Sequence, residues 1–209
     1  MTVTICIIAA TCVVSFMAFN NVKLTDAFIF HPPAVTYQNQ WYRFFTCGFL
    51  HADLPHLAFN MFSLYMFGDM VETAFSDIFG SLGWLLYLIL YVAALFVSLM
   101  PTYQANKTNN YYNSLGASGA VSAIVFAGIL FYPTVKIGLF ILPPIIPGFV
   151  FGPIYLAITV YLSKQGNDNI NHSAHFWGAL FGVAYTIVMC YALSSFQPVA
   201  HFIDTILGK

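Results

Sequence analysis

Long stretches of apolar side chains, almost free of charge, constrain this chain more than any other feature of its sequence. Only 6% of its 209 residues are charged and 60% are hydrophobic, whereas a soluble globular chain carries about 25% charged residues. So few charges cannot build a surface that faces water, so lipid must cover most of the molecule. The sequence therefore predicts an all-α, multi-pass membrane protein.

Six stretches have the composition of a membrane-spanning helix, which needs roughly 20 mainly apolar residues. They cover residues 3–19, 54–71, 81–100, 118–131, 146–162 and 172–193. Pro101 is expected to end the third helix, and prolines 143, 144, 147 and 153 interrupt the approach to the fifth, because proline lacks a helix donor. The length leaves no room for a sizeable soluble module, so we expect one membrane domain over residues 1–209.

Several other classes of protein are disfavoured by the same sequence. The net charge of −1 and the absence of a basic stripe speak against a nucleic-acid partner. The four cysteines show no spacing typical of a disulfide framework or a metal site and are expected to be small buried hydrophobes: Cys6, Cys12, Cys47 and Cys190. The sequence therefore disfavours both a disulfide framework and a zinc site. The apolar N-terminus lacks the features of a cleaved signal peptide and is interpreted as a retained helix.

The connections between the helices suggest how they are arranged. Residues 20–53 are rich in Trp, Tyr and Phe, which favour the headgroup zone, so we expect an interfacial structure there. Residues 102–114 are the most polar run and should lie in water. Six crossings place this run, residues 20–53 and residues 163–171 on the side opposite the termini. The helices beginning near 54, 118 and 172 therefore start on one membrane face. The few basic residues favour termini outside the cell.

Polar side chains cluster at the starts of these three helices. Ser118 stands in Gly-Ala-Ser-Gly at the start of the fourth helix, where free backbone N–H groups can stabilise an oxyanion; a helix cap in a patch of small residues is the plainer interpretation. His175, Gly178 and Gly182 share one face of the sixth helix, so the glycines would let another helix approach the histidine. We expect His172, one turn earlier, to be interfacial.

The second helix carries His56 and Asn60 at positions i and i+4, on one face. They could staple the interfacial segment, or act as two hydrogen-bond donors aimed at one point. A nucleophile, a base and oxyanion donors are the groups that acyl transfer requires. Acidic residues lie in a loop or near the other face, so a Ser–His dyad is favoured over a triad; they are Asp69, Glu72, Asp77 and Asp168.

With these residues in view, the chain resembles the rhomboid family of intramembrane serine proteases from about Trp41 to Gly182. Residues 116–119 match the family's GxSG, and residues 174–182 match its AHxxGxxxG. The HxxxxHxxxN segment is matched by His51, His56 and Asn60. Arg43 matches the family's arginine in the interfacial loop. Gly68 and Glu72 match a glycine and a glutamate near the far end of the second helix.

The resemblance implies that Ser118 is the nucleophile and His175 its general base, with an oxyanion hole formed by His56, Asn60 and the Ser118 backbone N–H. It implies that His51 and Arg43 order the interfacial loop. It also implies a six-helix core with cytoplasmic termini in bacterial members, contrary to the charge count, and here we follow the motifs. Transmembrane proteins are the implied substrates and membrane lipids the surroundings, and the implied reaction needs no metal and no cofactor. The oligomeric state is left open.

Two departures from the family pattern stand out, and two rival functions stay open. Some members have a tyrosine one turn after the nucleophile, where this chain has Ser122, and Trp41 and Arg43 are separated by Tyr42. A non-catalytic relative that binds transmembrane clients is the main alternative function, and a transporter is a more distant one. The lack of appended domains favours a bacterial-type enzyme of the inner membrane, and the prolines before the fifth helix suggest that this helix moves to admit substrate.

Overall fold

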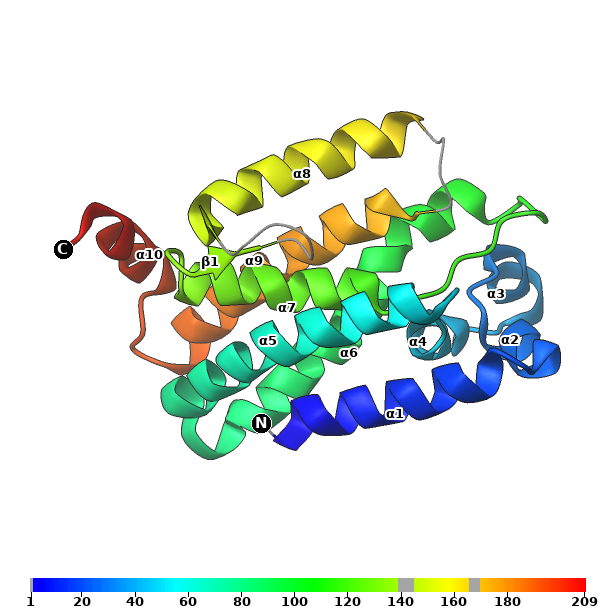
Figure 1. Cartoon of the computed structure of the whole chain (residues 1–209), viewed down its shortest axis with the longest axis horizontal. Helices are drawn as coiled ribbons and strands as arrows, with labels where there is room; N and C mark the ends of the chain where they lie inside the picture. Colours follow the sequence, from blue (N-terminus) through cyan, green and yellow to red (C-terminus); the bar gives the residue numbers. More distant parts are fainter. Residues whose placement is uncertain (1, 139–144, 166–169) are drawn as a thin grey trace.

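A computed structural model describes residues 2–138, 145–165 and 170–209, and within these the chain is a bundle of helices (Figure 1). The main helices are α1 (Thr2–Ala18), α5 (Leu54–Phe79), α6 (Gly83–Asn106), α7 (Ser118–Phe131), α8 (Gly148–Gln165) and α9 (His172–Leu193). Helix α7 is the central one, packed against α5, α6 and α9, and nearly all its residues are buried. Helix α8 lies at the edge, against α9 and α7 (Figure 1).

The observed helices begin close to the predicted positions, and α7 and α9 have the predicted bounds. The predicted end of the third helix at Pro101 was wrong, because α6 continues to Asn106 with the proline inside it. A proline removes one helical hydrogen bond, and packing offsets this loss here. In the added turn Tyr103 lies 5.7 Å from the rings of both Trp41 and Phe44, and Thr102 donates a hydrogen bond to Asn171 (3.1 Å). The polar run expected in water therefore begins as buried helix.

Length and composition alone mark two helical stretches of the described residues as able to cross a membrane. One is Leu54–Asn106, which joins α5 and α6 through the 3₁₀ turn η2 (Gly80–Leu82), and the other is α9. Helix α5 also runs to Phe79 rather than ending near residue 71. Helices α1 and α7 are apolar but shorter. The predicted count of six spanning helices therefore stays a prediction, while the helical fold class is observed.

The segment between α1 and α5 is folded rather than a simple loop, as its aromatic content suggested. It contains α2 (Val22–Phe28), α3 (Pro32–Gln38), α4 (Arg43–Thr46) and the 3₁₀ turn η1 (Cys47–Phe49). The Arg43 guanidinium donates to the carbonyls of Asp26 (2.8 Å) and Ile29 (2.7 Å), so it ties α4 to the end of α2. The buried ring of Phe30 packs 4.9 Å from that of Phe44. These contacts order the segment around α6.

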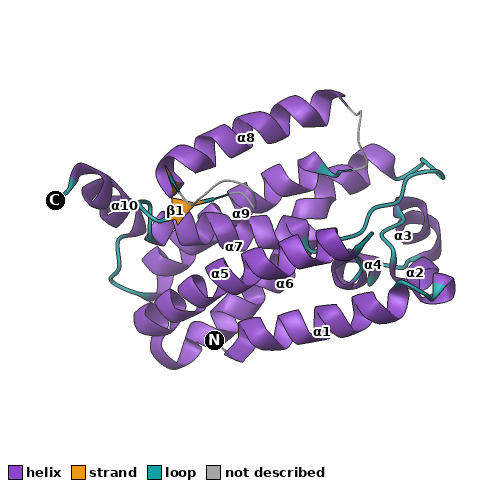
Figure 2. Ribbon diagram, viewed as in Figure 1, coloured by secondary structure: helices purple, strands orange, loops and turns teal. Residues whose placement is uncertain are grey.

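Two features of the C-terminal half were not predicted. A short antiparallel pair, β1 (Lys136–Ile137) with β2 (Ile146–Pro147), precedes α8, and a further helix α10 (Pro198–Leu207) follows α9 (Figure 2). Imidazole Nε2 of His201 in α10 lies 2.9 Å from the Phe131 carbonyl oxygen, so α10 docks on the end of α7. The predicted effect of prolines 143 and 144, and the position of Asp168, fall outside the described residues.

The cysteines are free thiols, and not all of them are buried. Cys47 and Cys190 are buried and Cys12 is half-buried, but Cys6 is exposed, so the prediction that all four are buried was wrong for Cys6. Cys6 lies on the outer side of α1, which faces lipid if α1 spans the membrane, and an apolar thiol is tolerated there. Burial raises the pKa of the Cys47 thiol in η1 to about 12.

Candidate active site

A glycine turn sets up the start of α7. Gly116 has a φ of +118°, a backbone conformation that favours glycine, and its N–H donates to the Cys47 carbonyl (3.0 Å). Ser118 then becomes the first residue of α7. The N–H of Val121 donates to the Ala117 carbonyl (2.9 Å), so the amides of Ser118, Gly119 and Ala120 precede that first helical hydrogen bond. The side chain of Ser118 thus lies at the positive end of a helix.

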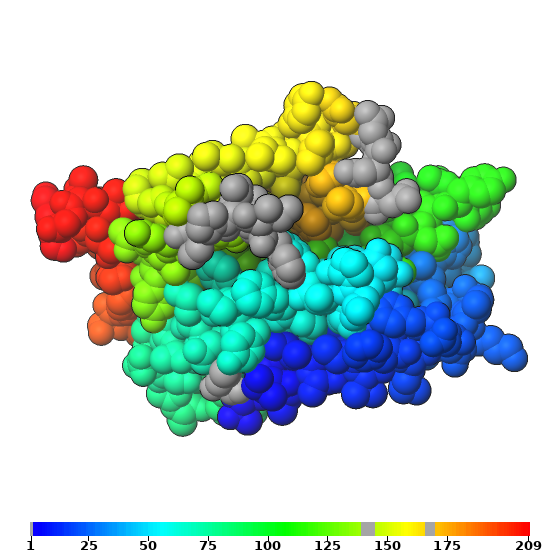
Figure 3. All heavy atoms as spheres, viewed as in Figure 1, coloured from blue at the N-terminus to red at the C-terminus, as the bar shows by residue number. Residues whose placement is uncertain are grey.

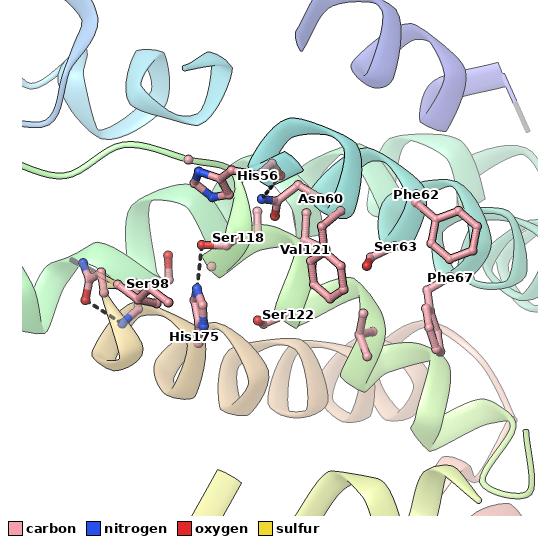
Figure 4. A pocket seen from close by; sticks show the side chains of 18 of the residues that line it. His56, Asn60, Phe62, Ser63, Phe67, Ser98, Ser118, Val121, Ser122 and His175 are labelled. Carbon is pink, nitrogen blue, oxygen red and sulfur yellow. Dashed lines mark hydrogen bonds between the residues drawn. The ribbon is translucent and has the colours of Figure 1, made fainter. Parts of the chain in front are cut away.

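Helix α9 reaches α7 through the two glycines that the sequence places on one face. A Cβ atom built at Gly178 would overlap the carbonyl oxygen of Gly119, and one at Gly182 would overlap that of Ala123. The two backbones are therefore in direct contact, as the glycine spacing predicted. This contact brings His175 Nε2 to 2.7 Å from Ser118 Oγ, the dashed contact at the centre of Figure 4. That distance is a hydrogen bond in which the imidazole can accept the serine proton.

His172 is buried against neighbouring side chains, and its predicted position at the membrane interface stays a prediction. The side-chain oxygen of Asn171 accepts from the Ala174 N–H (3.0 Å), which caps α9, and from the Thr102 hydroxyl (3.1 Å), which ties this cap to α6. The first turn of α9 is thereby drawn inward. The His172 ring then lies edge-on to His175, with centroids 6.0 Å apart, and restricts where the His175 ring can go.

His56 and Asn60 reach the same place from the first turns of α5. The Asp53 carboxylate caps this helix by accepting from the His56 N–H (2.7 Å). His56 Nδ1 accepts from the Ala52 N–H (3.4 Å), so the neutral ring carries its proton on Nε2. A Cβ atom at Gly116 would lie 3.1 Å from this Nε2 and 3.9 Å from Ser118 Oγ. The donor atom of His56 is therefore held beside the serine.

The buried Asn60 side chain lies near His56 in Figure 4 and lines the same cavity. Its Nδ2 donates to the His56 carbonyl (3.0 Å) within α5. An amide nitrogen carries two hydrogens, so this bond orients the side chain and leaves a second hydrogen available.

His51 supports His56 from behind. Ser15 Oγ of α1 donates to the Phe49 carbonyl (2.6 Å), so at the His51 contact (3.0 Å) it accepts from Nδ1–H. The His51 and His56 rings are T-shaped, with centroids 4.9 Å apart. Burial, with a smaller contribution from His56, lowers the pKa of His51 to about 3. His51 therefore stays neutral, and its contacts link α1 to the His56 ring.

One cavity of about 960 Å³, called the cleft below, is lined by the four residues predicted for the site together with apolar side chains of α5, α7 and α8. The four are Ser118, His175, His56 and Asn60. Figure 3 shows α5 (cyan) and α8 (yellow) on one face of the molecule, and side chains of both helices line this cavity. Asp53 lines this cavity too, but its carboxylate caps α5. The Glu72 carboxylate lies at the other end of α5, bonded to the first amides of α1. Across the part of the chain described here, no three metal-ligating side chains come together.

Comparison with known proteins decides the family. The family model described as a rhomboid domain matches residues 38–192, a stretch that includes Ser118, His175, His56 and Asn60. The chain belongs to the rhomboid family. The family assignment made from the three motifs is therefore confirmed, and with it the assignment to membrane proteins.

Curated relatives of this rhomboid protein come from plants and animals. It is 33% identical to Rhomboid-like protein 11, chloroplastic, of Arabidopsis thaliana over 75% of the chain and 54% of that protein. It is 31% identical to RHOMBOID-like protein 12, mitochondrial, of the same plant over 64% of the chain and 42% of that protein. The human Presenilin-associated rhomboid-like protein, mitochondrial, is 31% identical over 66% of the chain and 35% of that protein. The chain spans about half or less of the length of these relatives.

One contact of the rhomboid cleft was missed by sequence reasoning. At Ser122, where some family members have a tyrosine, the hydroxyl oxygen lies 3.1 Å from the hydroxyl of Tyr155 in α8. The Tyr155 ring packs 5.6 Å from that of Phe126. Tyr155 sits within an apolar helix among other aromatic residues, and no local pattern distinguishes it. Serine in place of tyrosine at position 122 was the one sequence signal that a side chain from another helix fills this space.

Proposed function

We propose that this rhomboid protein is an intramembrane serine endopeptidase that hydrolyses peptide bonds of transmembrane proteins near one membrane face. The observation that carries the proposal is the 2.7 Å hydrogen bond between Ser118 Oγ and His175 Nε2 at the N-terminus of a buried helix. A serine that only capped its helix would bond a nearby backbone amide; this one bonds an imidazole from another helix.

The proposed reaction follows the geometry of the dyad. His175 Nε2 takes the proton of Ser118 Oγ as the oxygen attacks the substrate carbonyl carbon, and the carbonyl oxygen becomes an oxyanion. Three donors face this region: the Ser118 N–H at the helix start, Nε2–H of His56 and the amide group of Asn60. Their fixed positions stabilise the oxyanion without reorganisation. The oxyanion then collapses, the C–N bond breaks, and protonated His175 gives its proton to the leaving amine.

The acyl-enzyme is resolved by the same groups. Neutral His175 removes a proton from water, the resulting hydroxide oxygen attacks the ester carbon, and Ser118 leaves with the proton from His175. Water reaches the dyad from the face where α5, α7 and α9 begin. That face also carries Tyr111, which is 96% exposed, in the connection between α6 and α7.

The walls of the cleft support a transmembrane segment as substrate. Along α5 the side chains of Phe59, Phe62 and Met66 line the cavity and are 46%, 57% and 48% exposed. An apolar wall of this kind suits lipid and an apolar peptide rather than a soluble one. A peptide bond inside an intact helix is shielded by its hydrogen bonds, so residues that destabilise the substrate helix should favour cleavage.

The membrane arrangement belongs to the same proposal. We propose that α1, α5, α6, α7, α8 and α9 are the six spanning helices. The bacterial plasma membrane expected from the sequence stays a prediction, because the relatives named above carry mitochondrial and chloroplastic names.

The test compares cleavage of a reporter transmembrane substrate in liposomes by wild type, Ser118→Ala and His175→Ala. Ser163→Ala is the matched control, since that hydroxyl is exposed on α8 and bonds its own helix. The proposal predicts cleavage by wild type and the control alone, and labelling of Ser118 by a fluorophosphonate in those same two proteins. If wild type binds transmembrane segments but neither cleaves nor labels, the function is that of a non-catalytic client-binding relative.

A further inference from the structure

Helix α8 is loosely held compared with the helices around it. Three of its 18 residues are buried, and all three are small: Gly148, Gly152 and Thr159. Its main helix contacts are with α9 and α7. Because its buried positions carry no large apolar side chain, the position of α8 depends on a small number of specific interactions.

The contact between Tyr155 and Ser122 is the interaction best placed to fix α8. It joins the two hydroxyl groups at 3.1 Å, and the Tyr155 ring lies between Phe126 of α7 and Phe151 of α8, with both centroids 5.6 Å away. Ser122 follows Ser118 by one turn of α7, about 6 Å along the axis. Figure 4 shows Ser122 on the same side of α7 as the Ser118–His175 pair.

The surroundings make this hydroxyl pair harder to separate than one in water. Both residues line the cleft among apolar side chains, and Ser122 is 6% exposed. A hydroxyl group without a partner in an apolar environment is unfavourable. Moving α8 away from α7 therefore leaves both groups unsatisfied until another polar group replaces them.

We propose that Ser122 and Tyr155 are positioning residues for the substrate: their hydrogen bond fixes α8 as the wall of the cleft opposite α5. This inference rests on the proposed function. An extended chain advances about 3.3 Å per residue, so a substrate whose scissile carbonyl lies at Ser118 has its next two residues at the level of this pair. The position of α8, fixed by Tyr155, therefore determines how the cleft binds the substrate residues adjacent to the scissile bond.

The first experiment measures steady-state cleavage of a reporter transmembrane substrate in liposomes by Tyr155→Phe, Ser122→Ala and the double variant. Hydrogen bonds between membrane helices are worth enough for KM to rise about 3- to 15-fold in each single variant. The double variant should resemble the singles, since either change removes the same bond. Labelling of Ser118 by a small fluorophosphonate, which does not span the cleft, should fall less than cleavage. Tyr161→Phe is the matched control, because that tyrosine of α8 is 62% exposed.

The second experiment does not depend on activity. Hydrogen–deuterium exchange of the α8 amides in detergent should speed up about 3- to 15-fold in Tyr155→Phe and Ser122→Ala, and remain at the wild-type rate in Tyr161→Phe. Unchanged exchange, or additive effects on KM, would overturn the inference. An equal loss of labelling and cleavage would also overturn it, because the pair would then act on the dyad itself. Wild type that neither labels nor cleaves, with the exchange effect intact, would instead refute the proposed function.

Discussion

The contact between the backbones of α7 and α9 leads to a sharp prediction for Gly178→Ala. The added methyl group would overlap the Gly119 carbonyl oxygen, and backbone cannot move aside as a side chain does. Normal van der Waals separation requires α9 to shift outward by about 1 Å. The bond from His175 Nε2 to Ser118 Oγ, now 2.7 Å, would lengthen to about 3.7 Å, beyond the range of a hydrogen bond.

A misplacement of this size lowers the rate of an enzyme by about 100-fold, so kcat should fall by that factor. The assay is cleavage of a reporter transmembrane substrate, with the rate of fluorophosphonate labelling as a second readout and circular dichroism to show that the helices remain. Gly152→Ala is the matched control: its methyl group would lie 3.5 Å from the Phe126 ring, an ordinary contact, and should change the rate less than about twofold. A folded Gly178→Ala protein with wild-type kcat would refute the claim that this contact sets the dyad distance.

Three further predictions concern the supports of the site. Glu72→Gln weakens hydrogen bonds to the first amides of α1 (2.7–3.0 Å) and should cost about 2 kcal/mol in thermal unfolding; the exposed Asp69→Asn should cost little, and equal losses would contradict the capping role. His51 has a pKa of about 3 in the folded protein against the ordinary histidine value of 6.5, so the folded protein binds fewer protons than the unfolded chain. The free energy of unfolding should therefore fall by about 1.4 kcal/mol per pH unit as pH drops below about 6.5. If the His51→Gln variant shows the same dependence of unfolding free energy on pH, His51 is not the group responsible. His56→Phe should lower kcat about 10²- to 10³-fold with little change in KM; a change in KM alone would remove His56 from the oxyanion hole.

Much of this architecture could be predicted from local sequence. Apolar length places α7 and α9 with their observed bounds, and the three motifs identify the family. The positions of His56 and Asn60 on one face, and of His175 with Gly178 and Gly182 on another, follow from helical periodicity. These properties depend on residues a few positions apart, and therefore a single sequence carries them directly.

Other features depend on contacts between distant segments. Pro101 should end a helix by its own chemistry, yet aromatic packing from the segment between α1 and α5 carries α6 on to Asn106. The burial of His172 is another such feature, because the Asn171 cap and its hydrogen bond from Thr102 hold the first turn of α9 against α6.

The sequence by itself determined that this chain is a helical membrane protein of the rhomboid family, because hydropathy and motif spacing are local. Only the tertiary structure decided that Ser118 and His175, 57 positions apart, meet at 2.7 Å, since that distance depends on how closely two glycine-bearing backbones pack. It likewise decided that Tyr155 of α8 binds Ser122. The sequence determines the chemistry of each side chain, but the packing of helices that lie far apart along the chain determines which other side chain it contacts.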